Sequence, residues 1–264
     1  MRDIMIKIGT CGYRYYKPGK DWEDNYESKL QVYSHTFPCV ELNKTFFKLP
    51  MVKTAERWRE EVYDDFEFTM KAWQALTHTT DSPSWSKNKE YLTADQRKNF
   101  GYLRPNEEVL NAWKETKKIA EALEAKVVVI QTPPSFECTE ENKENMFEFF
   151  ENIDKGELEI AWDPRGEWTD NEDEISKICN EFGLIHIVDI MRKRPVSEHD
   201  ISYVRLHGLN ENIYDYDYNY SKQELMKLAG RLKGLDREFE TVYCMFNNFE
   251  MFENANSLIK ILEK

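Results

Sequence analysis

The feature that most constrains the fold is a short apolar run, the length of one strand, that recurs along the chain and ends each time in polar residues. Helical patterns separate most of these runs, and this alternation is typical of a parallel barrel with helices outside. The predicted strands are Ile4–Ile8, Cys39–Leu42, Phe66–Met70, Val127–Ile130, Leu158–Ala161, Leu184–Ile190, Tyr203–Leu206 and Thr241–Phe246. The expected fold class is therefore α/β, a single parallel (β/α)8 TIM barrel spanning residues 1–264 as one domain. Such barrels carry their active sites at the C-terminal ends of the strands.

Two connections are expected to depart from the regular alternation. The helical patterns are Asp24–His35, Lys53–Val62, Asn106–Ala125, Glu140–Ile153, Glu172–Phe182, Ser221–Leu232 and Asn248–Leu262. The segment from Lys71 to Asn106 is too long for an ordinary connection, and we expect a lid or binding insertion there. The segment from Ile190 to Ser202 is too short for a crossover helix and carries Arg192, Lys193 and Arg194 instead.

Length and composition agree with one barrel. The chain has 264 residues, of which 41% are hydrophobic, and a TIM barrel has roughly 250 residues. No apolar run reaches the roughly 20 residues of a membrane span, and nothing resembling a signal peptide precedes the first strand. The five cysteines are scattered without a CxxC pair, which favours a reducing compartment. We therefore expect the cytoplasm.

The charge balance restricts the partners. At a formal net charge of −13, an extended nucleic-acid interface or an anionic membrane surface is not expected, because both require basic surfaces. A local basic pocket for a small anionic molecule remains compatible with this charge. The sequence has no Walker A, GxGxxG or GxSxG pattern, so no nucleotide cofactor is predicted, and a divalent metal is the one cofactor left open.

Alternation along the strands separates lumen-facing from helix-facing residues. Glu41 and Asn43 alternate with Val40 and Leu42, and Arg205 alternates with its apolar neighbours in the same way. Because the apolar face packs against the outer helices, the polar set is expected at the mouth of the lumen. The predicted mouth residues are Glu41, Asn43, Lys71, Gln131, Asp163, Arg165, Asp189, Arg205, His207, Asn247 and Asn248.

Several of these segments together resemble the YecE-like family, also called domain of unknown function family 72. The matching segments cover nearly the whole chain in order: Ile8–Tyr13, Val40–Pro50, Thr77-His78, Gln131–Pro134, Tyr203–Gly208 and Phe246–Asn248. The resemblance implies a TIM barrel and a site at these residues, and it implies no particular reaction.

One stretch departs from the pattern of that family. Many members carry a Glu-Phe-Arg-His run before a Trp at the fifth strand, whereas this chain has Trp162–Trp168 with the sequence WDPRGEW. The acid, the arginine and the tryptophan are kept as Asp163, Arg165 and Trp168, but no histidine follows Arg165.

The favoured function is hydrolysis or phosphoryl transfer on a phosphorylated or otherwise anionic small substrate. Arginine offers two parallel donors to phosphate or carboxylate oxygens, and lysine adds a compact charge. In this hypothesis Glu41 or Asp163 is the general base and His207 the general acid. The expected substrate-binding residues are Asn43, Lys71, His78, Gln131, Arg165, Asp189, Arg205, Asn247 and Asn248.

Three alternatives use the same residues differently. Glu41, Asp163, Asp189 and His207 could ligate a divalent metal, as in hydrolase, isomerase or nuclease barrels. The basic pocket could bind a small anion without turnover. The charges could also pair off in a closed network, for example Glu41 with Arg205 or Asp163 with Lys71.

Two loop features lie beside the predicted mouth. His78, in the long third connection, would complete the site if that segment acts as a lid, or would be an ordinary surface residue. Four tyrosines follow the seventh strand and either stack on a base or sugar ring or form a solvated loop: Tyr214, Tyr216, Tyr218 and Tyr220.

Overall fold

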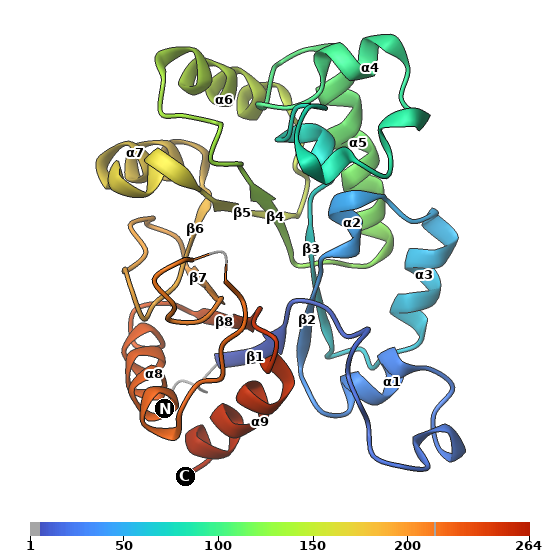
Figure 1. The fold of residues 1–264 in the computed structure, drawn as a ribbon, viewed down its shortest axis with the longest axis vertical. Coiled ribbons are helices and arrows are strands. Elements are labelled where there is room, and N and C mark those ends of the chain that lie inside the picture. The colour runs from blue at the N-terminus through green and yellow to red at the C-terminus, as the bar shows by residue number, and fades with distance from the viewer. Residues whose placement is uncertain (1–5, 214) are drawn as a thin grey trace.

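The strands form one closed parallel barrel. The structure is a computed structural model that describes residues 6–213 and 215–264. Each strand pairs with the next along the chain, and β1 pairs with β8 to close the ring. Figure 1 shows the strands meeting at the centre with the helices arranged around them in chain order. The predicted fold class is confirmed.

The strand positions agree closely with those predicted. The bounds are β1 Ile6–Thr10, β2 Cys39–Leu42, β3 Glu67–Lys71, β4 Val127–Gln131, β5 Glu159–Asp163, β6 Ile185–Val188, β7 Ile201–Leu206 and β8 Thr241–Phe246. The β2 and β8 ranges are the predicted ones, whereas β6 is shorter than the predicted Leu184–Ile190. Residues 4 and 5 of the first predicted strand lie outside the described residues.

The helices differ from the predictions mainly at the N-terminal end. Their bounds are α1 Lys29–Ser34, α2 Lys44–Phe47, α3 Val52–Glu60, α4 Ala94–Asn99, α5 Glu107–Ala122, α6 Glu140–Asn152, α7 Glu172–Phe182, α8 Lys222–Leu235 and α9 Met251–Leu262. Helix α1 begins later than the predicted Asp24 because Ser28 caps it, accepting a hydrogen bond from the Gln31 amide at 3.1 Å. Helices α2 and α4 are too short to show helical periodicity, so the sequence pattern missed them.

Strand alternation divides the core into two layers. The lumen holds a separate apolar cluster beneath the polar mouth: Cys11, Cys39, Val127, Val129, Ala161, Ile185, Ile187, Tyr203, Tyr243 and Met245. The residues between them on each strand, such as Val40, Val128 and Val204, belong to the larger cluster under the helices. The lumen is therefore filled below its mouth, as in other barrels of this size, and only the mouth can hold a ligand.

Both irregular connections are present as predicted. The segment from Ala72 to Asn106 carries short 3-10 turns and α4, and it packs its own aromatic cluster of Trp73, Trp85 and Phe100 against the barrel. No helix lies between β6 and β7. Among the described residues, none of the helices combines the length and apolarity needed to cross a membrane.

Candidate active site

Arg205, on β7, lies at the centre of the mouth and is almost fully buried. Its Nη2 donates to Glu41 Oε1 at 2.9 Å, and its Nη1 donates to Asp163 Oδ2 and, at 3.3 Å, to Gln131 Oε1. The other Glu41 oxygen accepts a 2.9 Å hydrogen bond from the Tyr203 hydroxyl. Glu41 has no exposed surface, so in this conformation it holds Arg205 in place and cannot reach a ligand.

Asp163, at the end of β5, joins Arg205 to a second arginine. Arg165 Nη2 donates to Asp163 Oδ2 at 2.9 Å and lies 3.2 Å from His207 Nε2. Burial alone would raise the pKa of Asp163, but Arg165 and Arg205 outweigh it and hold that pKa well below its usual range. Asp163 is therefore a firmly ionised anchor for two guanidinium groups and a weak base.

His207 is held in its neutral form. Burial, together with the nearby Arg165 and Arg205, lowers its pKa well below the usual value. Because a guanidinium can only donate hydrogen bonds, Nε2 must accept from Arg165, and the ring proton then resides on Nδ1. In this state His207 supplies a neutral N–H donor, whereas the general-acid role predicted from the sequence would be strongest for a ring protonated on both nitrogens.

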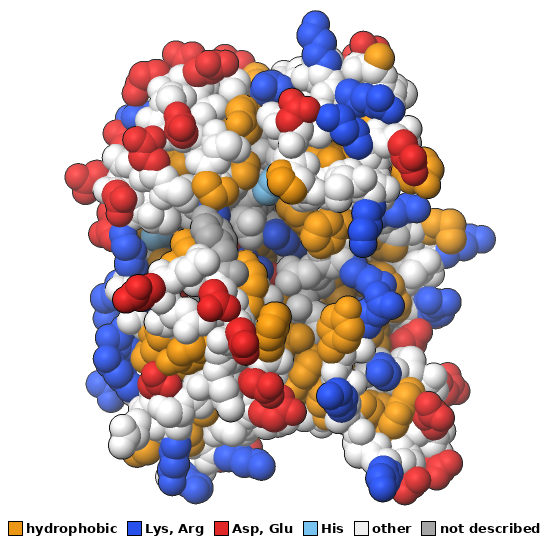
Figure 2. All heavy atoms as spheres, in the orientation of Figure 1, with side chains coloured by type: hydrophobic (Ala, Val, Ile, Leu, Met, Phe, Trp, Pro, Cys, Tyr) orange, Lys and Arg blue, Asp and Glu red, His pale blue; other side chains and the backbone are white. Residues whose placement is uncertain are grey.

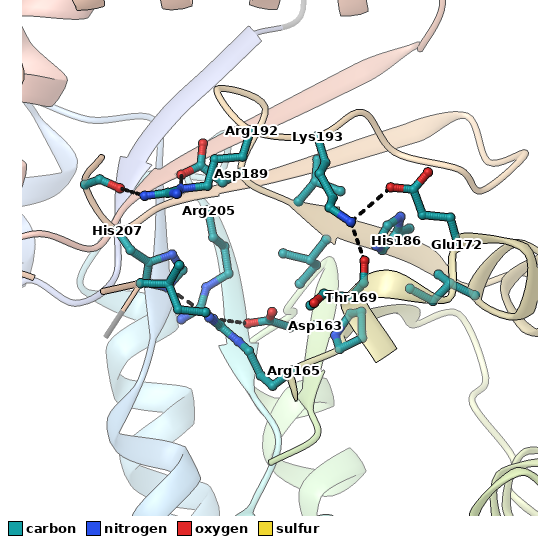
Figure 3. Close-up of a pocket in the computed structure, with 16 residues that line it drawn as sticks. Asp163, Arg165, Thr169, Glu172, His186, Asp189, Arg192, Lys193, Arg205 and His207 are labelled. Carbon is teal, nitrogen blue, oxygen red and sulfur yellow. Dashed lines mark hydrogen bonds and ion pairs between the residues drawn. The ribbon is translucent and has the colours of Figure 1, made fainter. Parts of the chain in front are cut away.

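A cavity of about 190 Å³ opens beside these residues, between the ends of β5, β6 and β7. Figure 3 shows three charged groups around it: Arg165 with Asp163, Arg192 with Asp189, and Lys193 with Glu172 and Thr169. Four basic residues line it (Arg165, Arg192, Lys193, Arg205) against three acidic ones (Asp163, Glu172, Asp189). Its size suits a small molecule, since drug-sized ligands occupy roughly 300 Å³ or more.

Asp189 is the carboxyl group in this cavity that exchanges a proton most easily. Burial raises its pKa to about 6, although the Met191 amide and Arg192 oppose the shift. Its Oδ1 accepts from the Met191 amide at 2.9 Å, and its Oδ2 lies 3.6 Å from Arg192 Nε without a hydrogen bond. A carboxyl group with this pKa can both accept and return a proton near neutral pH.

The basic run Arg192–Arg194 is divided between two environments. Arg192 and Lys193 line the cavity, where Arg192 also donates to the carbonyl oxygens of Gly208 and Asn210. Arg194 turns away and forms a pair of hydrogen bonds with Glu238 at 2.8 and 2.7 Å. Only two of the three residues can therefore contact a ligand in the cavity.

Lys71 lies in another part of the mouth, at the end of β3. Its Nζ is 3.9 Å from the centroid of the Phe46 ring, and no ion pair joins it to a described acidic residue. The Asp163–Lys71 pair proposed from the sequence is thus absent among the described residues, whereas the Glu41–Arg205 pair is present. Burial and Arg205 lower the pKa of Lys71 to about 7.

The remaining predicted residues are spread around the mouth. His78 is buried in the insertion, where Nδ1 lies 2.8 Å from the Thr77 hydroxyl and its ring contacts Phe46 edge-on. Burial and Lys71 lower the pKa of His78 to about 3. Asn43 donates to the Cys11 carbonyl at 3.3 Å, so it bridges the ends of β2 and β1.

A second cavity, of about 540 Å³, lies between the ends of β8 and β1. Asn247 and Asn248 line it together with Tyr15 and Phe249, whose side chains are largely exposed. Asn248 Nδ2 donates at 2.7 Å to both the Tyr218 carbonyl and Asn254 Oδ1, which fixes the loop before α9. Figure 2 shows apolar side chains around the central hollow of this face and charged side chains farther out.

The tyrosines after β7 have separate roles. Tyr214 lies outside the described residues. The Tyr216 ring lies 5.5 Å from the His207 ring and lines the second cavity, so it remains available to a ligand. Tyr218 donates to Glu224, and the buried Tyr220 hydroxyl accepts from the Gly208 amide. The last two are structural contacts of the loop.

The geometry does not support the metal alternative. Among residues 6–213 and 215–264, no three His, Cys, Asp or Glu side chains are grouped so that they could hold a metal ion. Glu41 and Asp163 are occupied by Arg205, and His207 by Arg165.

Several residues at or just below the mouth were missed as site residues at the sequence level, among them Glu172, which lines the cavity from α7, and also Tyr203 and Phe46. Tyr203 shares the lumen-facing parity of Arg205, two positions earlier on β7, so strand alternation alone could have identified it. Phe46 lies in an unpredicted short helix, and only the folded chain brings its ring to Lys71.

Comparison with known proteins places these observations in a family. A family model described as "Protein of unknown function DUF72" matches residues 7–264. UPF0759 protein YunF of Bacillus subtilis (strain 168) is 25% identical over 290 residues, which cover 98% of this chain and 95% of that protein. UPF0759 protein YecE of Escherichia coli (strain K12) is 39% identical over 74 residues, covering 28% of this chain and 26% of YecE.

Solved structures show the same fold. The crystal structure of a DUF72 family protein (TM1631) from Thermotoga maritima MSB8 is 25% identical, with a TM-score of 0.72 and coverage of 98% of this chain and 100% of that one. D-psicose 3-epimerase, solved in the presence of D-fructose, has a TM-score of 0.58 at 9% identity, covering 98% of this chain and 100% of that one. The second likeness concerns the barrel fold alone.

Proposed function

This chain belongs to the DUF72 family, as its sequence motifs predicted, and from the geometry of its mouth we propose that it is an enzyme acting on a small anionic substrate. The proposed reaction is hydrolysis or phosphoryl transfer on a phosphorylated or otherwise anionic small molecule. The proposal includes neither an extended nucleic acid nor a membrane as partner. The five free cysteines fit an enzyme of the reducing cytoplasm, which we propose as its location.

The observation that carries the proposal is the state of Arg165. Both of its hydrogen bonds, to Asp163 and to His207, leave from Nη2. Its Nη1 makes no hydrogen bond to the described residues. Nε also lacks a partner but is buried away from water, whereas Nη1 is not. A guanidinium edge that is held rigidly at a cavity and left without a partner suits one oxygen of a phosphate or carboxylate.

The other residues of the cavity supply proton transfer. Asp189 has a pKa raised to about 6 by burial, so it can take a proton from a water molecule and return it to a leaving group. Neutral His207 offers its Nδ1–H as a hydrogen-bond donor to negative charge that develops on the substrate. In this assignment Glu41 and Asp163 are positioning residues that hold Arg205 and Arg165.

Ligand-induced thermal stabilisation tests the proposal. We expect phosphate or acetate to raise the melting temperature above that in chloride of equal ionic strength. At tenfold excess over Kd, mass action adds about 1.4 kcal/mol, or roughly 3–5 °C for a chain of this size. Arg165→Gln should remove the shift, whereas Arg194→Gln, which changes an arginine paired with Glu238 outside the cavity, should keep it.

Equal shifts in all three proteins, or no shift with either anion, would contradict the proposal. Arg205 is unsuitable as the test residue, because its removal leaves Glu41 buried without its cation and Asp163 with Arg165 alone. Breaking such a buried pair destabilises a protein by about 3–5 kcal/mol, and this would obscure any effect on binding.

A further inference from the structure

The side chain of Lys71 differs from the other cations at the mouth because no acidic group pairs with it. Arg165 and Arg205 both contact Asp163, and Arg192 contacts Asp189. Lys71 has no such partner among the described residues, and its Nζ lies 3.9 Å from the Phe46 ring centroid. Lys71 keeps part of its surface exposed at the mouth, although it lines neither of the two cavities described above.

A specific contact holds the aromatic ring against this nitrogen. Helix α2 follows β2 directly, and its Thr45 hydroxyl, which is buried, donates to the carbonyl oxygens of both Leu42, at 2.7 Å, and Lys71. The neighbouring residue on α2 is Phe46. The hydrogen bond to the Lys71 backbone thus joins α2 to the end of β3, next to the residue whose Nζ lies over the Phe46 ring.

This environment favours the uncharged amine. Burial is the largest cause of the lowered pKa of Lys71, about 7, and the nearby positive charge of Arg205 adds to it. Glu41 and Asp163 act in the opposite direction, but their two negative charges are paired with Arg205 and Arg165. Desolvation and a neighbouring cation are the two means by which enzymes activate a lysine as a nucleophile.

We propose that Lys71 is a nucleophile of this site and that it forms an imine with the carbonyl group of a small anionic aldehyde or ketone. This inference rests on the anionic-substrate site proposed above but does not depend on hydrolysis. It adds a further activity, because an imine allows the bonds next to the former carbonyl carbon to be broken or rearranged.

The step is balanced without any further reactant. The lone pair of Nζ adds to the carbonyl carbon, and a proton moves from nitrogen to the former carbonyl oxygen, giving a carbinolamine. Loss of that oxygen as water then gives the imine, so one amine and one carbonyl yield one imine and one water. No oxidant or reductant takes part.

The barrel sets the size of the substrate. Lys71 ends β3 and Asp163 ends β5, with only β4 between them. Two strand spacings amount to roughly 10 Å at the backbone. Arg165 is close enough to Lys71 for its positive charge to lower the pKa of the amine. A small oxo acid or a short sugar phosphate can therefore place its anionic group at Arg165 and its carbonyl group at Lys71.

Reductive trapping tests the inference. The full-length protein is incubated at pH 7 with glyoxylate and cyanoborohydride, which reduces an imine to a stable secondary amine, and the modified lysines are identified by peptide mass spectrometry. A lysine with a pKa near 7 has on the order of 1000-fold more free amine at pH 7 than an ordinary lysine. We expect labelling of Lys71 to exceed that of exposed Lys48 by about tenfold or more.

Two variants and a competitor define the other outcomes. Lys71→Arg should lose only this adduct, and Lys48→Arg should leave it unchanged. Excess phosphate should slow the labelling of Lys71. If phosphate has no effect on the rate, the assignment of Lys71 to the anion site is overturned. Labelling of Lys71 no faster than that of Lys48 would overturn the inference while leaving the thermal test of anion binding intact.

Discussion

Two aspartates at the ends of neighbouring strands respond to burial in opposite ways. Asp163 accepts hydrogen bonds from Arg165 and Arg205, and they keep its pKa low although burial raises it. Among the described residues Asp189 pairs with Arg192 alone, at 3.6 Å, and Arg231 and Arg165 act on it from farther away. Burial therefore prevails, and its pKa rises to about 6. Residues of one type therefore have different functions here, an anchor and a proton carrier, according to the number of cations that each contacts.

The two aspartates should affect stability with opposite sign. Asp189 has a raised pKa, so its contribution to stability is complete below about pH 4 and is lost as pH rises through about 6. Asp189→Asn should therefore increase the free energy of unfolding at pH 7, by about 1–3 kcal/mol, with little effect at pH 4. Chemical denaturation at both pH values measures the difference.

Asp163→Asn is the matched variant for this comparison. Asp163 has a lowered pKa, so its contribution is present above the usual aspartate value and is lost as pH falls below it. This variant should lower the free energy of unfolding by about 3–5 kcal/mol at pH 7, because two buried arginines lose a partner. A change of the same sign in both variants would show that the two environments are not distinct.

At the scale of elements, the ends of the strands are held by short segments that have little helical periodicity. Helix α2 has only four residues, yet it presents Phe46 to Lys71 and ties β2 to β3 through Thr45. After β7, Gly208 has a φ of 110°, and a Cβ there would lie 2.5 Å from that of Tyr218. The site is thus shaped by the connections, which also supply Arg165, Asp189 and Arg192, whereas the strands supply Asp163 and Arg205.

Thr45 should have an effect on stability that depends on its hydroxyl. Thr45→Val keeps the shape but removes the donor shared by two buried carbonyl groups, so we expect a loss of about 1–3 kcal/mol in the free energy of unfolding. Thr45→Ser keeps the donor and should lose much less. Denaturant unfolding of both variants gives the comparison, and equal losses would assign the effect to packing.

At the scale of the whole molecule, a chain with a strongly negative net charge has a cavity lined by more basic than acidic residues. The chain carries a net charge of −13, whereas the smaller cavity has four basic and three acidic lining residues. Figure 2 shows Asp and Glu side chains gathered over α6 and α7 on the face that contains the central hollow. Such a surface admits a small anion to the pocket but repels a long polyanion.

We therefore expect no binding of a short DNA duplex at physiological salt, measured by fluorescence anisotropy. A basic DNA-binding protein loses affinity steeply with salt, in proportion to the phosphates it neutralises. The control is a titration at low salt, where weak nonspecific binding would be strongest. Binding with such a salt dependence would show that the mouth continues into a basic surface.

Much of the fold was predictable because local pattern and tertiary packing agree. Strand alternation placed Glu41 and Arg205 on the lumen face and their apolar neighbours on the helix face. It could do so because the strand period does not depend on distant parts of the chain. The predicted helix Asp24–His35 was only partly right. Asp24 ends a 3-10 turn, residues 25–27 are not helical, and α1 begins after the Ser28 cap. Short segments such as α2 lie below the length at which periodicity is visible.

The sequence by itself determined the barrel, and it predicted a mouth at the ends of the strands with most of its charged residues, although not Glu172. Only the tertiary structure decided which charges pair: Asp163 with two arginines and Lys71 with an aromatic ring. The physical reason is that pairing and desolvation depend on side chains from strands far apart in the chain, such as Glu41 and Arg205. Protonation follows from those contacts, so the chemistry of the site is a property of the folded barrel.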